Sequence, residues 1–133
     1  MPVGVIVREL ALLGYLRRFQ GCPTGSAVIT PGFKLPARFI LHAVGPVYRD
    51  GRGGEPELLT SAYDVSFQLA LEEPSIRTIA FPAISTGVYG YPKKEAARIA
   101  VSRMRAQESA FDRIVACLFD AESTDIYRRL LAP

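Results

Sequence analysis

The segment 85–91, which reads Ser-Thr-Gly-Val-Tyr-Gly-Tyr, has the residue types that most suggest ligand chemistry. It follows an apolar stretch and precedes Pro92, a residue that suits the first turn of a helix. Glycines let backbone N–H groups approach an anion closely, and a following helix directs its partial positive end toward the same point. This pattern is typical of a phosphate-binding loop, but an ordinary tight connection between a strand and a helix has it too.

Other residues of chemical interest are better explained without catalysis. His42 is the single histidine and falls inside an apolar stretch, so we expect a core imidazole rather than a general base. One histidine and no Cys-x-x-Cys spacing predict no metal site. Cys22 and Cys117 lie far apart in the sequence, and we expect both to be buried free thiols. Ser85 lacks the Gly-x-Ser-x-Gly context of a serine hydrolase.

Composition places the chain among single globular domains. It has 133 residues, of which 49% are hydrophobic and 22% charged, and its formal net charge is +3. The charge permits an anionic partner, but 13 acidic residues balance the 16 basic ones along the chain. We expect no membrane span, because Arg8, Arg17 and Arg18 interrupt the apolar N-terminal stretch. We expect no secretory signal, because the basic residues follow this stretch instead of preceding it. The expected location is cytoplasmic, and no cofactor is expected.

Short apolar segments alternate with stretches of helical period, which predicts an α/β layer fold. The expected strands cover Val3–Val7, Val28–Thr30, Phe39–Val44, Arg77–Ile84 and Arg113–Phe119. The expected helices cover Glu9–Phe19, Pro56–Glu72, Pro92–Gln107 and a short C-terminal segment capped by Ser123. Pro82 lacks a backbone N–H, so it predicts an irregularity at the end of its strand and close to a site.

Several segments together resemble the macro domain family, and in particular its MacroD-type ADP-ribosyl hydrolase branch. They are Gly-Cys-Pro-Thr-Gly at 21–25, Leu-Pro-Ala-Arg-Phe-Ile-Leu-His-Ala-Val-Gly-Pro at 35–46, Ala-Phe-Pro-Ala-Ile-Ser-Thr-Gly-Val-Tyr-Gly-Tyr-Pro at 80–92, and Cys-Leu-Phe-Asp at 117–120. The resemblance covers residues 17–133. We therefore expect one macro-like domain over residues 1–133, with a divergent N-terminal segment at 1–16.

The resemblance implies a three-layer α/β/α fold with a mixed sheet and a cleft for ADP-ribose. The residues that would wrap the diphosphate, mainly with backbone N–H groups, are Ser85, Thr86, Gly87, Val88, Tyr89 and Gly90. The ring of Tyr89 would pack beside the distal ribose. Phe119 and Asp120 match the adenosine end of the family site, where an aromatic ring can stack on the base. Phe119 is equally compatible with a plain core position.

The chain departs from the family at its N-terminus. It has no counterpart of the Gly-Asp-Ile-Thr-like motif or of the Asn-Ala-Ala-Asn-like motif and the following Asp, which orient the ribose and activate water. From the resemblance, we expect this sequence to lack roughly the first third of the usual domain, including a strand from the sheet interior. Three remedies are open: Val3–Val7 refills the strand position, a second copy covers the edge, or the chain is a piece of a longer product. The first two predict an altered sheet or a homodimer.

Three functions remain in view. The leading hypothesis is binding of ADP-ribose or an ADP-ribosylated protein, with no catalytic residue assigned because the usual catalytic motifs are absent. The first alternative is an active mono-ADP-ribosyl or O-acetyl-ADP-ribose hydrolase in which a carboxylate such as Glu9 or Asp50 replaces the missing groups. The second is a non-enzymatic binder of nucleic acid or poly-ADP-ribose, which the basic balance favours.

Overall fold

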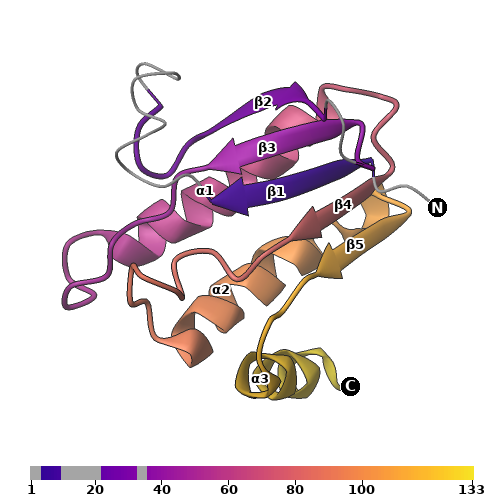
Figure 1. Ribbon diagram of the computed structural model, residues 1–133. Helices are drawn as coiled ribbons and strands as arrows, with labels where there is room; N and C mark the ends of the chain where they lie inside the picture. The colour runs from indigo at the N-terminus through magenta and orange to yellow at the C-terminus, as the bar shows by residue number, and fades with distance from the viewer. Residues whose placement is uncertain (1–3, 10–21, 33–35) are drawn as a thin grey trace.

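A computed structural model of the chain describes residues 4–9, 22–32 and 36–133 (Figure 1). Its described part contains a five-stranded sheet in the order β2-β3-β1-β4-β5. The strands are β1 (Val5–Glu9), β2 (Ala27–Pro31), β3 (Phe39–Ala43), β4 (Thr78–Phe81) and β5 (Arg113–Ala116). Of the strands that the structure describes, only β2 runs antiparallel to its neighbour. The expected α/β class with a mixed sheet is therefore confirmed.

Strand β1 occupies the centre of this sheet. It pairs in parallel with β3 over its whole length and with β4 at Val5 and Ile6. Val5 and Val7 are buried in the core, as their β-branched side chains favour. The N-terminal apolar segment thus refills an interior strand position, although its bounds are shifted from those expected. Glu9 ends this strand, so the expectation that it begins a helix was wrong, and the rest of that expected helix lies outside the described residues.

Two expected strands end earlier than their apolar runs. Strand β4 ends at Phe81, directly before Pro82, because proline has no N–H to continue the ladder. The neighbouring β5 ends at Ala116, and the Cys117 N–H donates to the Phe81 carbonyl oxygen at 2.7 Å. The segments after β4 and β5 therefore leave the regular sheet at the same edge. This is the irregularity that Pro82 predicted.

The described helices are α1 (Glu55–Leu71), α2 (Lys93–Ala106), α3 (Ala121–Leu131) and the short 3-10 helix η1 (Glu108–Ala110). Figure 1 shows α1 and α2 on the same face of the sheet, with α3 beyond the β5 edge. Asp120 is the N-cap of α3, because its carboxylate accepts the Ser123 N–H at 2.7 Å. The expectation that Ser123 is the cap was wrong by three positions. None of the helices in the described part of the chain is long and apolar enough to cross a membrane.

Aromatic side chains join α1 to the sheet. The ring of Phe67 lies 4.9 Å from that of Phe81 and 5.6 Å from that of Phe111, measured between centroids. Tyr63 packs against Phe81 at 5.2 Å. These tilted arrangements suit aromatic rings and add to the free energy of burial. The core thus fixes α1 against β4, the strand that leads into the glycine-containing loop.

His42 has the structural role expected for it. It lies in β3 with 6% of its surface exposed. Its Nε2 atom is 2.9 Å from the Thr30 hydroxyl oxygen of the neighbouring β2. A buried imidazole that makes such a hydrogen bond supports the pairing of the two strands.

The loop before α1 is organised around one buried carboxylate. Glu55 accepts the backbone N–H groups of four loop residues, with distances of 2.6–3.2 Å, namely Arg49, Asp50, Gly51 and Gly53. These hydrogen bonds, led by that of Arg49, lower the pKa of Glu55 to about 2. The ionised carboxylate therefore stabilises this loop at neutral pH.

The variant Glu55→Gln tests this role. It places an amide NH2 group where the N–H donors converge, so we expect the Tm at pH 7 to fall by several degrees. Glu57→Gln, in the same helical turn but exposed, is the matched control and leaves the Tm nearly unchanged.

The direction in which the stabilisation by Glu55 changes with pH follows from its lowered pKa. Because the folded pKa lies below the ordinary 4.5, the stabilisation by Glu55 is complete above about pH 4.5 and is lost as the pH falls toward 2. The difference in Tm between the wild type and Glu55→Gln should therefore narrow across this window in calorimetric scans. A difference that stays constant down to about pH 2 contradicts the assignment.

Candidate functional site

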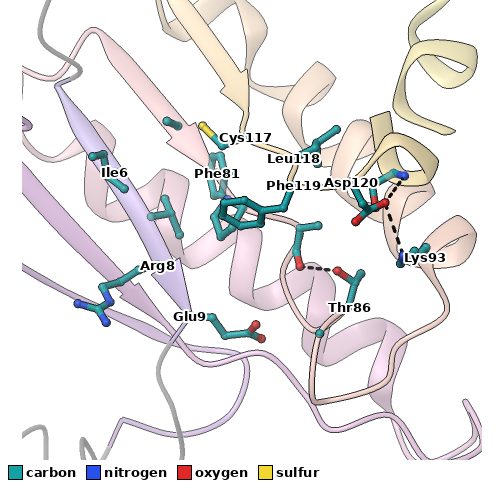
Figure 2. Close-up of a pocket in the computed structure, with 16 residues that line it drawn as sticks. Ile6, Arg8, Glu9, Phe81, Thr86, Lys93, Cys117, Leu118, Phe119 and Asp120 are labelled. Carbon is teal, nitrogen blue, oxygen red and sulfur yellow. Dashed lines mark hydrogen bonds and ion pairs between the residues drawn. The ribbon is translucent and has the colours of Figure 1, made fainter. Parts of the chain in front are cut away.

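A cavity of about 730 Å³ lies at the carboxyl ends of β1, β4 and β5 (Figure 2). Ligand sites of parallel α/β sheets lie in this position, because the loops that follow neighbouring strands converge there. The walls come from the ends of these strands, from the loop after β4 and from the start of α2. The lining residues include Phe81, Thr86, Gly87, Leu118, Phe119 and Asp120.

The structure brings four of the eight predicted site residues to this cavity. They are Thr86, Gly87, Phe119 and Asp120. Val88 and Gly90 are exposed and Tyr89 is half-buried in the same loop, but none of the three lines the cavity. Ser85 is fully buried beneath the loop. Of the six predicted loop residues, two therefore line the cavity, one is buried and three lie outside the cavity lining.

The loop is held by its own hydrogen bonds. The N–H of Gly90 donates to the Gly87 carbonyl oxygen at 3.0 Å, and that of Tyr91 donates to Ser85 at 2.9 Å. The Thr86 hydroxyl donates to the Ala83 carbonyl oxygen at 2.9 Å. The N–H groups of Gly87 and Val88 donate to none of the residues that the structure describes. Two adjacent backbone donors are thus available in a loop that is otherwise fixed.

Gly87 also leaves space at the cavity. A Cβ atom at this position would meet no atom within 4 Å. A ligand can therefore approach the backbone here without displacing protein atoms. Gly90 has a φ of 70°, in the region that favours glycine, and so accounts for the second glycine of the loop by backbone geometry.

Glu9 is the site residue that the sequence placed least well. Its Oε2 atom accepts the Ser85 N–H at 2.8 Å, and the Ser85 hydroxyl lies 3.5 Å away. Ser85 has a φ of 68°, a strained value for a residue with a side chain, and the bond to Glu9 holds it there. Burial raises the pKa of the Glu9 carboxyl, while the bond from the Ser85 N–H opposes this. The sequence named Glu9 only as a carboxylate that could replace the missing groups, and it placed Glu9 at the start of a helix instead of the end of a strand.

Asp50, the other carboxylate considered, does not line this cavity. Its side chain accepts the Arg52 N–H at 2.9 Å in the exposed loop before α1. The sequence offered Glu9 and Asp50 as equal candidates to replace the missing groups. In the structure, Glu9 lines the cavity and Asp50 does not.

Tyr63 of α1 supports the irregular backbone after β4. Its hydroxyl lies 3.5 Å from the Pro82 carbonyl oxygen and accepts the Ile84 N–H at 3.4 Å. Burial raises the pKa of Tyr63, so the hydroxyl stays protonated. Sequence periodicity placed this residue on a helix but could not show which backbone atoms it meets.

The opposite end of the cavity carries Phe119 and Asp120. Phe119 is 94% exposed, so the alternative of a plain core residue was wrong. Both carboxylate oxygens of Asp120 bind Ser123, and Lys93 lies 3.5 Å away. The hydrogen bond from the Ser123 N–H lowers the pKa of Asp120, which is therefore ionised at neutral pH.

The cysteines differ from each other. Cys22 is buried, as expected. Cys117 is exposed and lines the cavity, so the expectation of a buried thiol was wrong there. The cause is the early end of β5, which leaves Cys117 outside the regular sheet. Neither cysteine forms a disulfide.

Comparison with known proteins defines the class. The macro domain family model matches residues 10–100. A macro domain-containing protein of Chlorobaculum tepidum is 48% identical over 124 residues, covering 91% of this chain and 72% of the relative. An O-acetyl-ADP-ribose deacetylase of Klebsiella pneumoniae is 51% identical over 114 residues, covering 84% of this chain and 65% of the relative. This chain belongs to the macro domain family.

Solved structures agree with this assignment. The Oceanobacillus iheyensis macrodomain with ADP has a TM-score of 0.86 and 32% identity, covering 98% of this chain and 84% of its own. The Trypanosoma brucei macrodomain in complex with ADP has a TM-score of 0.84 and 30% identity, covering 99% of this chain and 65% of its own. The macro-domain fold expected from the sequence is therefore confirmed.

A pair of glycine variants tests the packing beneath the site. In Gly45→Ala, the new Cβ would overlap the Ser85 hydroxyl, lying also 2.6 Å from Ile84 Cγ2 and 2.9 Å from Glu9 Oε2. We expect thermal unfolding to show a loss of about 1–3 kcal/mol, the usual cost of overpacking. Gly87→Ala adds the same methyl group in open space and should unfold like the wild type. Equal stability of the two variants contradicts this packing.

Proposed function

We propose that the chain binds ADP-ribose, free or attached to a protein, with the diphosphate at Gly87 and Val88. One observation carries the proposal: two adjacent backbone N–H groups lack partners in the described structure, beside a cavity that is open at Gly87. Hydrogen bonds from N–H groups to an ionised acceptor are about twice as strong as neutral ones. The ADP complexes of the similar macrodomains support this choice of ligand.

The cavity also offers a place for the apolar part of such a ligand. The exposed ring of Phe119 and the side chains of Leu118 and Phe81 line the side away from the loop. An exposed aromatic ring at a cavity can stack on a nucleotide base. We therefore place the adenine beside Phe119, with the ribose and diphosphate extending toward Gly87.

Titration calorimetry with ADP-ribose, ADP and AMP tests the ligand class. We expect ADP-ribose and ADP to bind, and AMP to bind at least about tenfold more weakly, because it lacks one phosphate that the loop donors would hold. Equal affinities for ADP and AMP that fall steeply with salt concentration would favour the alternative of a nucleic-acid or poly-ADP-ribose binder.

Three expectations from the sequence stay predictions. They are membership of the MacroD-type branch, a cytoplasmic location and a homodimer.

The variant Gly87→Val tests the placement within the cavity. Its branched side chain enters the open space in front of the loop, so we expect ADP affinity to fall by at least about tenfold, equivalent to 1.4 kcal/mol. Thermal unfolding should be nearly unchanged, because the new Cβ atom meets no atom within 4 Å. If a stable Gly87→Val variant binds ADP with wild-type affinity, the diphosphate does not lie at Gly87 and the proposed position is wrong.

A further inference from the structure

Glu9 has an arrangement that anion binding does not require. One carboxylate oxygen, Oε2, is fixed by the N–H of Ser85. The other, Oε1, accepts no hydrogen bond from the residues that the structure describes. Figure 2 shows the side chain extending from the end of β1 toward the loop that carries Thr86. A carboxylate with one anchored oxygen and one open oxygen is held in a defined orientation and can still accept a proton.

Glu9 is also distinct from the other carboxylate of the cavity wall. Asp120 uses both oxygens to cap α3 and is close to Lys93. It therefore has no oxygen left in a comparable position. Among the residues that line the cavity, Glu9 alone combines a carboxylate with an oxygen that has no described partner.

The surroundings of Glu9 favour proton uptake. Burial raises the pKa of this carboxyl, which makes the ionised form a stronger base than an exposed glutamate. Titratable and charged groups reach this region from several elements. They are Arg8 of the same strand, Tyr63 of α1, Tyr89 of the loop, Lys93 at the start of α2, Cys117 after β5, and Asp120.

We propose that Glu9 is the general base for hydrolysis of an ester on the ribose of a bound ADP-ribosyl group. This inference rests on the proposed function, because the diphosphate at Gly87 and Val88 would hold the substrate beside Glu9. The carboxylate belongs to β1, whose last residue lines the cavity.

The step balances without a metal or cofactor. The open oxygen of Glu9 accepts a proton from water as the water oxygen forms a bond to the ester carbonyl carbon. The bond from that carbon to the ribose oxygen then breaks, and Glu9 returns the proton to the departing ribose oxygen. When the substrate is O-acetyl-ADP-ribose, the products are ADP-ribose and acetic acid, which ionises to acetate and releases one proton to the solvent. Nothing is oxidised or reduced.

Hydrolysis of O-acetyl-ADP-ribose by the full chain and by Glu9→Gln tests the proposal. The glutamine can still accept the Ser85 N–H through its amide oxygen, so the fold should be retained. We expect kcat to fall by at least about 100-fold, the lower range for loss of a general base. ADP-ribose binding by calorimetry should stay within about threefold and the Tm nearly unchanged, because the anchoring hydrogen bond remains. Asp50→Asn is the matched control and should retain wild-type turnover.

The pH profile separates a base from a structural residue. For the wild type, kcat should decline as the pH falls through the raised pKa of Glu9, above 4.5, and the residual activity of Glu9→Gln should lack this limb. Wild-type turnover by Glu9→Gln overturns the proposal, as does equal loss of ADP-ribose binding. Binding by the wild type without any hydrolysis also overturns it and leaves the proposed function intact. Absence of binding by the folded wild type overturns both.

Discussion

The site depends on the parallel pairing of β1 between β3 and β4. This strand closes the sheet interior, buries Val5 and Val7, and brings its last residue to the edge where β4 and β5 also end. Without it, two interior strand edges would have unpaired backbone groups, which is costly in a protein core. The same five residues therefore complete the sheet and deliver Glu9 to the cavity.

Backbone N–H groups serve two separate purposes in this fold. Before α1, four of them converge on the carboxylate of Glu55, so that loop is satisfied within the protein. After β4, Glu9 engages the N–H of Ser85 but the next donors, at Gly87 and Val88, have no partner among the described residues. The contrast supports our proposal that an anionic ligand binds at the second loop and not at the first, although both loops contain two or more glycines.

Much of the fold followed from local patterns in the sequence. The spacing of apolar residues predicted helix α1, and the continuous apolar segment predicted strand β4. The sequence motif at 80–92 indicated the family. The positions of individual side chains did not follow, because they depend on contacts between distant segments. Phe119 is exposed, and Glu9 accepts the Ser85 N–H, because β1, β4 and β5 end at the same edge of the sheet. No local sequence pattern predicts that these three strands end together.

The placement of the diphosphate is tested most directly by a ¹H–¹⁵N correlation titration of the chain with ADP. The amide signals of Gly87 and Val88 should show the largest changes, because a charged acceptor would bind these two N–H groups directly. Signals of the loop residues 49–53 should stay in place, because their N–H groups already donate within the protein. Glu55 accepts four of them and Asp50 accepts that of Arg52. Changes centred on residues 49–53, or none near Gly87, would contradict the site described above.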